Sequence, residues 1–379
     1  MSIALHSVAF RHDGAAAGAG GSAIALRINA FKPVLVPEWV AGRLHNHPAA
    51  YAIDASALTP LSITATFTGT PGAVCEVTAL AANTDSPLGP TGQTLVRIGN
   101  DGRGGPVRLP LPWARVVSFG VGAHEQRWAW LQRTPGSSSW SVCGYSAHRI
   151  YTLLSTPTLP WVQHPLQPAN VQLPWAEVLE WACAWAAGSY DVRSAASAIA
   201  LALFTRTAGV LQYNCLFGGP TNYADPAFDC TSLLERLAGG PGRGPNVNCS
   251  DCATIVSTFA NALGCSLWQS RMFNLLLPFA INPVRLIGQP WFGPACGNGY
   301  FNYHEVAWDA WCSEADSVYD ASLAVQAPAW PQTPLLALVP TDLRFGWASS
   351  GQYRDLLVAP ASRLVCQPQP STRMRRLVY

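Results

Sequence analysis

The feature that most constrains the fold is a change in hydrophobic period along the 379-residue chain. Up to about residue 157, short runs alternate apolar and polar residues, as Ile63, Ala65 and Phe67 do with the threonines of SITATFTG. Clusters of Gly, Pro, Asn and Asp separate these runs, a pattern typical of antiparallel strands joined by turns. The pattern predicts a β-sandwich, with further strands at 115–122, 126–133, 139–146 and 148–155.

A proline-rich stretch without periodicity, residues 155–175, ends this region. Proline fixes φ and removes a backbone donor. We therefore predict a sandwich domain with an irregular N-terminal tail, a linker and a second domain, at 1–157, 158–175 and 176–379. Helix-period segments open the second domain and alternating runs follow them, at 176–188, 192–209, 230–240, 248–264 and then 266–325. Helices followed by an antiparallel sheet indicate an α+β domain, and so an α+β protein.

Composition excludes several classes of function. The net charge of +2 and the charged content of 12% predict neither a nucleic-acid partner nor an anionic membrane partner. The longest apolar run, residues 198–204, is too short to span a bilayer, and the N-terminus lacks the pattern of a secretory signal. Eleven cysteines without regular spacing favour a reduced chain, either cytoplasmic or exported without a signal peptide. The sequence predicts no oligomeric state.

Two cysteines lie three residues apart at the start of a predicted helix, in NVNCSDCATIVSTFANALG. Asn248 is a good N-cap and Gly264 a natural residue after the helix end. Cys252 begins the apolar stripe, whereas Cys249 lies at the helix tip. There the helix dipole and unpaired amides favour a thiolate and can hold an oxyanion. We therefore expect Cys249 to be the nucleophile and Cys252 to be core.

Three other interpretations of the pair stay open. Both residues can be core cysteines, because free cysteine is commonly buried. They can form a redox C-x-x-C pair, although the βαβ context of thioredoxin-like proteins is missing. They can bind zinc, although no other C-x-x-C supplies a second ligand pair.

A partner histidine is found in an alternating run, GYFNYHEVAWDAW, in which His304 shares a face with Val306 and Trp308. The turn-like CSEAD and a return strand, SVYDASLAV, follow. A hairpin centred near residue 312 brings His304 and Asp320 within side-chain reach. A carboxylate facing an imidazole performs the orienting role in a triad, and a structural His–Asp pair explains the same residues equally well.

These residues resemble the transglutaminase-like superfamily, a group of papain-like cysteine enzymes, in a bacterial-type form. Its C-x-D-x-A pattern and A-L-G helix end match Cys249, Asp251, Ala253 and residues 262–264. The following strand with the catalytic histidine, and an aspartate about sixteen residues later, are similar to the segments of His304 and Asp320. The resemblance covers about residues 176–325 and implies a papain-like α+β domain with a Cys-His-Asp triad.

The resemblance implies acyl transfer or hydrolysis on protein or peptide amides, without a metal or cofactor. The oxyanion donors would be the Cys249 N–H and, from position alone, Gln212 or Tyr213. We expect hydrolysis by default. Transamidation would need a cleft that excludes water. The residues that could line such a cleft are Trp268, Trp291, Phe292, Tyr303, Trp308 and Trp311. The alternative is a catalytically inactive structural or interaction protein whose β-sandwich binds a partner.

Overall fold

The computed structural model describes residues 2–12, 21–56, 60–157, 173–216, 221–273, 277–325, 343–346 and 352–379. They form two compact units. The first contains the described residues up to 156 together with 173–190, and the second contains those from 191 onward. Helices and sheets occur in both units, so the chain is an α+β protein, as its periodicity predicts.

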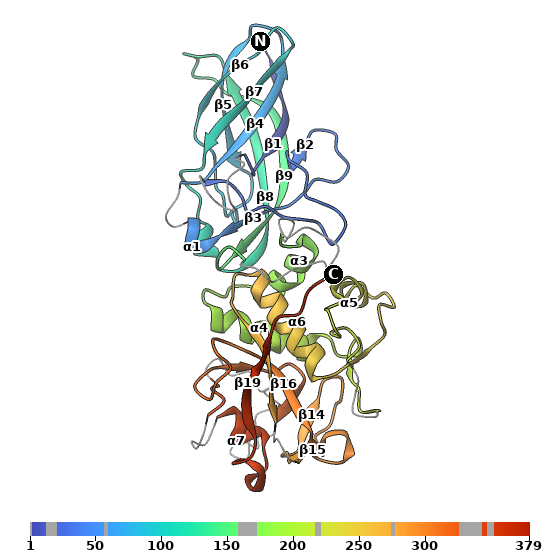
Figure 1. The fold of residues 1–379 in the computed structure, drawn as a ribbon. Coiled ribbons are helices and arrows are strands. Elements are labelled where there is room, and N and C mark those ends of the chain that lie inside the picture. Colours follow the sequence, from blue (N-terminus) through green and yellow to red (C-terminus); the bar gives the residue numbers. More distant parts are fainter. Residues whose placement is uncertain are drawn as a thin grey trace. The chain divides into compact units, whose positions relative to one another are not determined.

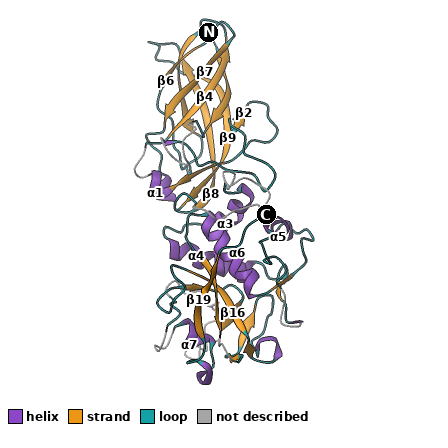
Figure 2. Ribbon diagram, in the orientation of Figure 1, coloured by secondary structure: helices purple, strands orange, loops and turns teal. Residues whose placement is uncertain are grey.

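The strands of the first unit form sheets that share one hydrophobic cluster (Figures 1 and 2). One sheet has the order β2-β1-β4-β7 and the other the order β3-β9-β8-β5-β6. Neighbouring strands are antiparallel except that β3 runs parallel to β9. The bounds are β1 Ile3–Ala9, β2 Trp39–Val40, β3 Ala49–Ala52, β4 Ser62–Gly69, β5 Val74–Ala81, β6 Thr94–Arg97, β7 Arg103–Pro110, β8 Gly122–Arg133 and β9 Ser141–Leu153.

Three local predictions for this unit are wrong. The tail predicted to be irregular contains β1, which lies between β2 and β4. The strand predicted at 115–122 is instead a helical turn, α2 Val116–Phe119, because a short apolar run does not distinguish strand from helix. The strands predicted at 139–146 and 148–155 are one long strand, β9. Its pairing with β8 continues through Ala147, the residue that separates the two predicted strands.

The first unit extends beyond the boundary expected from the sequence. Helix α3, Ala176–Trp185, packs on β8 and β9, and the Tyr151 hydroxyl donates to Glu180 Oε2 at 2.8 Å. Residues 173–190 therefore group with the first unit, although 176 is the predicted start of the second domain. Most of the predicted linker, 158–172, lies outside the described residues. A further short helix of this unit is α1 Ile53–Ser56.

In the second unit, helices come first and most strands follow. The helices are α4 Val192–Arg206, α5 Cys230–Leu237, α6 Cys249–Ala262 and α7 Tyr353–Leu357, with 3-10 turns η4 Ala295–Gly297 and η5 Pro360–Ser362. The strands are β10 Gln212–Tyr213, β11 Asn246–Val247, β12 Trp268–Phe273, β13 Phe279–Ala280, β14 Val284–Leu286, β15 Tyr300–Phe301, β16 Tyr303–Trp308, β17 Val318–Tyr319, β18 Leu323–Val325 and β19 Gln367–Met374.

An antiparallel sheet of order β17-β16-β12-β19 carries the residues discussed below. Helix α6 packs against β16 and β12, and also against α4 (Figure 1). Val306 and Trp308 of β16 contribute to a second hydrophobic cluster. The sequence does not predict β19, because its residues QPQPSTRM lack an alternating apolar pattern.

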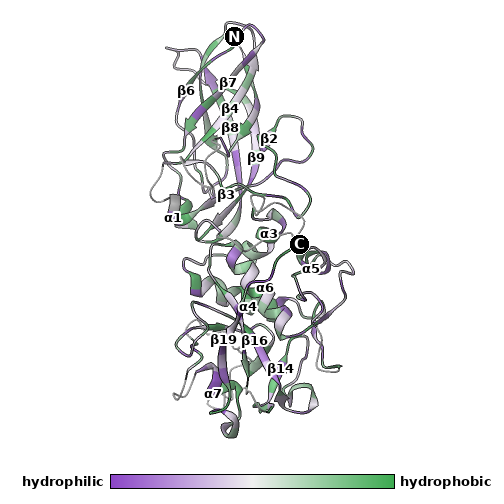
Figure 3. Cartoon of the chain, in the orientation of Figure 1, coloured by the Kyte–Doolittle hydropathy of each residue, from purple (hydrophilic) through white to green (hydrophobic). Residues whose placement is uncertain are grey.

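Helix α6 is buried on all sides, unlike the amphipathic helix that the sequence predicts. Its apolar stripe is buried as expected, but its polar side chains, among them Ser250, Thr254 and Ser257, are buried as well. Figure 3 shows hydrophobic and hydrophilic residues mixed along α6. The helix therefore needs buried polar partners on its second face. Among the described residues, no helix has both the length and the apolar composition to cross a bilayer.

Candidate active site

The first turn of α6 holds Cys249 at the helix N-terminus. The Asn248 side chain accepts from the Asp251 N–H at 3.0 Å, and Asp251 Oδ2 accepts from the Asn248 N–H at 2.9 Å. This reciprocal capping box confirms Asn248 as the N-cap. Gly264, with a φ of 91°, follows the end of the helix as predicted. Cys249 is the first helical residue, and its exposed fraction is 4%.

Asp251 has a structural role in addition to capping. Its carboxylate accepts from the N–H groups of Asn222 and Tyr223, at 3.0 and 2.8 Å. The fully buried carboxylate thus binds the preceding loop to the start of α6. The structure therefore gives Asp251 a physical function: it fixes the backbone that presents Cys249.

His304 comes from β16 and is completely buried. Its ring stacks on the ring of Phe301, with centroids 4.9 Å apart and an interplanar angle of 9°. β16 pairs with β17 in the predicted hairpin, with Ala307 opposite Tyr319. Asp320 follows β17 directly, and His304 Nε2 lies 2.9 Å from Asp320 Oδ2. The hairpin therefore brings the two side chains into hydrogen-bond contact.

The Asp320 carboxylate is held on every side. Oδ1 accepts from the N–H and the hydroxyl of Ser322, both at 2.7 Å. Oδ2 accepts from the Tyr353 hydroxyl at 2.7 Å, in addition to His304. Burial opposes ionisation, but the charge and hydrogen bond of His304, together with Ser322, lower the pKa of Asp320. The carboxylate is therefore ionised and fixed in orientation.

The other ring nitrogen of His304 differs from the well-bonded Asp320 carboxylate. Nδ1 is buried without a hydrogen-bond partner. Burial lowers the pKa of His304, but Asp320 and the nearby Cys249 thiol outweigh burial and raise it to about 10. The imidazole is thus cationic at neutral pH, and Cys249 is the group that its Nδ1–H interacts with. An unpaired buried donor is costly unless a reacting group uses it.

The two oxyanion candidates occupy different surroundings. Tyr213 lies at the thiol: burial, followed by the charges of Cys249 and Cys252 and a hydrogen bond with Cys249, raises its pKa well above the ordinary value. Its phenol therefore remains a neutral O–H donor. The exposed Gln212 amide instead donates to Asn246 Oδ1 at 3.1 Å. The structure brings Tyr213, and not Gln212, to Cys249.

Sequence reasoning did not find two of the residues around His304 and Asp320. Tyr353 lies on α7, 33 residues after Asp320, and no local pattern links the two. Phe301 precedes His304 by only three residues, and this short separation was the available signal for the contact of the two rings.

The aromatic residues expected to line a dry cleft have different surroundings. Trp308 is core, while Trp291 and Trp311 are exposed to 64% and 72%. Trp268 instead stacks under the guanidinium of Arg373, at 3.6 Å from its ring centroid. Trp311 lies over the same guanidinium, at 4.9 Å from its ring centroid, so these two tryptophans share one cation, and the cleft itself stays a prediction.

The cysteines differ from the expected reduced chain at one place. Cys215 and Cys296 form a disulfide that joins the segment after β10 to η4. Cys249 and Cys252 are free and buried. Within the described parts of the chain, no three His, Cys, Asp or Glu side chains come together as a metal site. The zinc interpretation of Cys249 and Cys252 therefore finds no third ligand among these residues.

Comparisons with known proteins identify no family for this chain. No protein-family model matches it, and no curated protein matches its sequence. It is similar to the crystal structure of red sea bream transglutaminase, with 13% sequence identity and a TM-score of 0.37. The match covers 66% of this chain and 45% of that chain, so less than half of the solved structure is represented. Because a TM-score of this size does not establish a common fold, we base the proposed function on the site geometry.

Proposed function

We propose that this chain is a cysteine-dependent acyl-transfer enzyme acting on amides of peptides or proteins. Its second unit would be a transglutaminase-like, papain-type α+β domain, and its first unit a β-sandwich. Cys249 is the nucleophile, His304 the general base and acid, and Asp320 the orienting residue. The observation that carries the proposal is the His304 ring, which bonds Asp320 through Nε2 and leaves Nδ1 unpaired near the Cys249 thiol.

The two ring nitrogens of His304 have separate tasks in this chemistry. The bond to Asp320 stabilises the imidazolium and fixes the ring, as an orienting carboxylate does in a triad. A cationic imidazole favours a thiolate at Cys249, which is already placed at a helix N-terminus. The thiolate and the proton it has lost therefore stay within one site, ready for both halves of the reaction.

Atoms balance through the proposed cycle as follows. The Cys249 thiolate attacks the amide carbonyl carbon, and a C–S bond forms. The tetrahedral intermediate expels the amine, which takes the proton from His304 Nδ1, and a thioester remains. Water then loses a proton to Nδ1 while its oxygen attacks the thioester. The C–S bond breaks, the acid leaves, and the thiolate–imidazolium pair is restored.

The oxyanion would be held by two donors that flank the sulfur. The Cys249 N–H is the first amide of α6 and so has no acceptor within the helix. The Tyr213 phenol lies at the thiol and keeps its proton, because its pKa is raised well above the ordinary value by burial and by Cys249. These are the roles that the site supports best for Tyr213 and the helix N-terminus.

We propose that water accepts the acyl group of the thioester. Water is present at about 55 M, so an amine competes only when it is bound or when the site is dry. Trp291 and Trp311, two of the residues expected to line a dry cleft, are exposed to 64% and 72%. We therefore propose hydrolysis of a peptide or carboxamide as the reaction.

The test offers a glutamine-containing peptide to the full chain, with and without millimolar primary amine, and follows the products by mass. We expect the hydrolysed product from the wild type in both samples and no product from Cys249→Ala. A predominant amine adduct would replace hydrolysis with transamidation. Equal product from Cys249→Ala and the wild type would contradict the proposal as a whole.

A further inference from the structure

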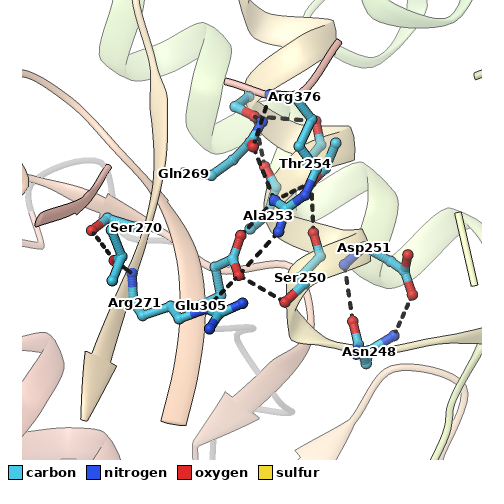
Figure 4. Close-up of polar contacts among 12 residues, drawn as sticks. Asn248, Ser250, Asp251, Ala253, Thr254, Gln269, Ser270, Arg271, Glu305 and Arg376 are labelled. Carbon is cyan, nitrogen blue, oxygen red and sulfur yellow. Dashed lines mark hydrogen bonds and ion pairs between the residues drawn. The ribbon is translucent and has the colours of Figure 1, made fainter. Parts of the chain in front are cut away.

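Ser250 and Glu305 are the sequence neighbours of Cys249 and His304. The Ser250 hydroxyl donates to Glu305 Oε2 at 2.8 Å, so the first turn of α6 is bonded directly to β16 (Figure 4). Successive side chains of a strand point to opposite faces, so Glu305 extends away from the side on which His304 meets Asp320. The same helix turn thus contacts the same strand twice, once at the reactive pair and once one residue further on.

Glu305 is almost entirely buried, at 1% exposure, and two arginines bind it. Arg376 donates through Nη1 to Oε1 at 2.5 Å and through Nη2 to Oε2 at 3.3 Å. Arg271, its cross-strand partner on β12, donates to Oε2 at 3.2 Å. Burial raises the pKa of Glu305, but Arg376 and the other donors outweigh burial and lower it, so Glu305 is ionised.

Arg376 connects this ion pair to the rest of α6. Its Nη1 also donates to Thr254 Oγ1 at 2.9 Å and to Gln269 Oε1 at 3.0 Å. The Gln269 amide in turn donates to Ser257 at 2.7 Å. Figure 4 shows Arg376 reaching in between α6 and the strand that carries Glu305. Successive turns of α6 are therefore fixed to β12 and β16 by polar contacts.

Such a buried network is an expensive way to gain stability, because apolar residues of similar volume often stabilise a core as well or better. What hydrogen bonds add is a defined distance and angle between the elements they join. Here the joined elements are those that carry Cys249 and His304, and a reacting pair loses about 100-fold in rate when it is misplaced by about 1 Å.

We propose that Glu305 is a positioning residue, which with Arg376 and Ser250 sets the approach of the α6 N-terminus to β16 and so places Cys249 against His304 Nδ1. This inference rests on the proposed function, since it assigns a second layer of residues to the same reactive pair. Glu305 acts through its neighbours and does not touch the reacting atoms.

The experiment measures the rate of alkylation by iodoacetamide, a small reagent that needs no substrate site, between pH 5 and pH 9. The alkylated residue is identified by mass, because other cysteines are present. Glu305→Gln keeps the shape and removes the charge that holds Arg376. The matched control is Asp229→Asn, which likewise neutralises a mostly buried carboxylate, at the N-cap of α5, bound to Arg243 at 2.6 Å. Thermal unfolding of both variants is measured in parallel.

We expect the alkylation of Cys249 at pH 6 to fall about 10- to 100-fold in Glu305→Gln, and its pH profile to move towards that of an ordinary thiol. Asp229→Asn should keep the wild-type profile even if its melting temperature falls as far. Equal profiles for the two variants would show that the network only stabilises the fold and would overturn the inference.

Ser250→Ala keeps the inference testable if Glu305→Gln does not fold. It removes the hydrogen bond from Ser250 to Glu305 and leaves the ion pair with Arg376 in place. We expect a smaller drop in alkylation at pH 6, with the wild-type melting temperature largely kept. An unchanged profile in Ser250→Ala would count against positioning through this contact. A wild type that is not alkylated at pH 6 would instead contradict the proposed function itself, which separates the two failures.

Discussion

The second unit contains two buried carboxylate–cation groups at neighbouring positions, and they differ in how completely their atoms are paired. On the Glu305 side, both carboxylate oxygens accept hydrogen bonds, and Oε2 and the guanidinium of Arg376 each have several partners. On the His304 side, Asp320 is equally well bonded, but the cation itself keeps one nitrogen without a partner. The paired group is suited to hold elements in place, whereas the unpaired nitrogen beside a thiol is suited to move a proton.

The largest effect should come from the thiol itself. Cys249→Ala removes the nucleophile, so hydrolysis and alkylation at this position should disappear within the detection limit. Cys252→Ala is the matched control three residues along the same helix, where burial raises the pKa of the thiol well above its ordinary value. It should keep activity and lose on the order of 1 kcal/mol of stability. Activity that survives Cys249→Ala and is lost in a folded Cys252→Ala would reverse the assignment.

Asp320→Asn should reduce the hydrolysis rate by about 10⁴-fold, because the amide no longer stabilises the imidazolium or fixes its tautomer. The control is Asp309→Asn in the same hairpin, whose carboxylate accepts from the Ser317 N–H at 2.8 Å. That variant should stay within a few-fold of the wild type. Similar rates for the two variants would remove Asp320 from the mechanism and leave it as a structural partner of His304.

Among substitutions around Glu305, Arg376→Met should lower the free energy of unfolding the most. It leaves the buried Glu305 with the Ser250 hydroxyl and the partly exposed Arg271, and breaking a buried ion pair in this way costs about 3–5 kcal/mol. Arg271→Met is the control and should cost about 1 kcal/mol or less, since its side chain is 38% exposed. Urea unfolding measures both. Equal losses would show that burial does not distinguish the two arginines.

The free energy of unfolding should depend on pH through the pair of His304 and Asp320. The pKa of His304 is raised from 6.5 to about 10, so its protonated form stabilises the fold. That contribution is complete below pH 6.5 and is lost as the pH rises towards 10. The free energy of unfolding should therefore fall over this range by more in the wild type than in His304→Gln. Parallel curves for the two proteins would show that the pair with Asp320 does not hold the proton.

Local signals explain which parts of this arrangement the sequence predicts. Asn248 and Gly264 mark the ends of α6, since caps act within a few residues. The hairpin that joins β16 and β17 follows from a turn and two alternating runs, and with it the contact of His304 and Asp320. Such features need only a short window of sequence.

The sequence does not predict contacts between segments that are far apart in the chain. Arg376 meets Glu305 across 71 residues, and nothing in a run of arginines indicates which one is buried. Tyr353 reaches Asp320 from α7, a helix with no strong periodic pattern. The burial of the polar face of α6 was missed for the same reason: polar residues on a helix predict solvent unless their partners are known.

The measurement that tests the central claim most directly is the pH profile of Cys249 alkylation in the wild type and in His304→Ala. If His304 activates Cys249 as proposed, the wild type should be alkylated readily at pH 5–6. His304→Ala should lose that reaction and follow an ordinary thiol. If the wild type instead reacts only as the pH approaches about 8.5, or if His304→Ala leaves the profile unchanged, the unpaired Nδ1 does not serve Cys249 and the proposed mechanism is wrong.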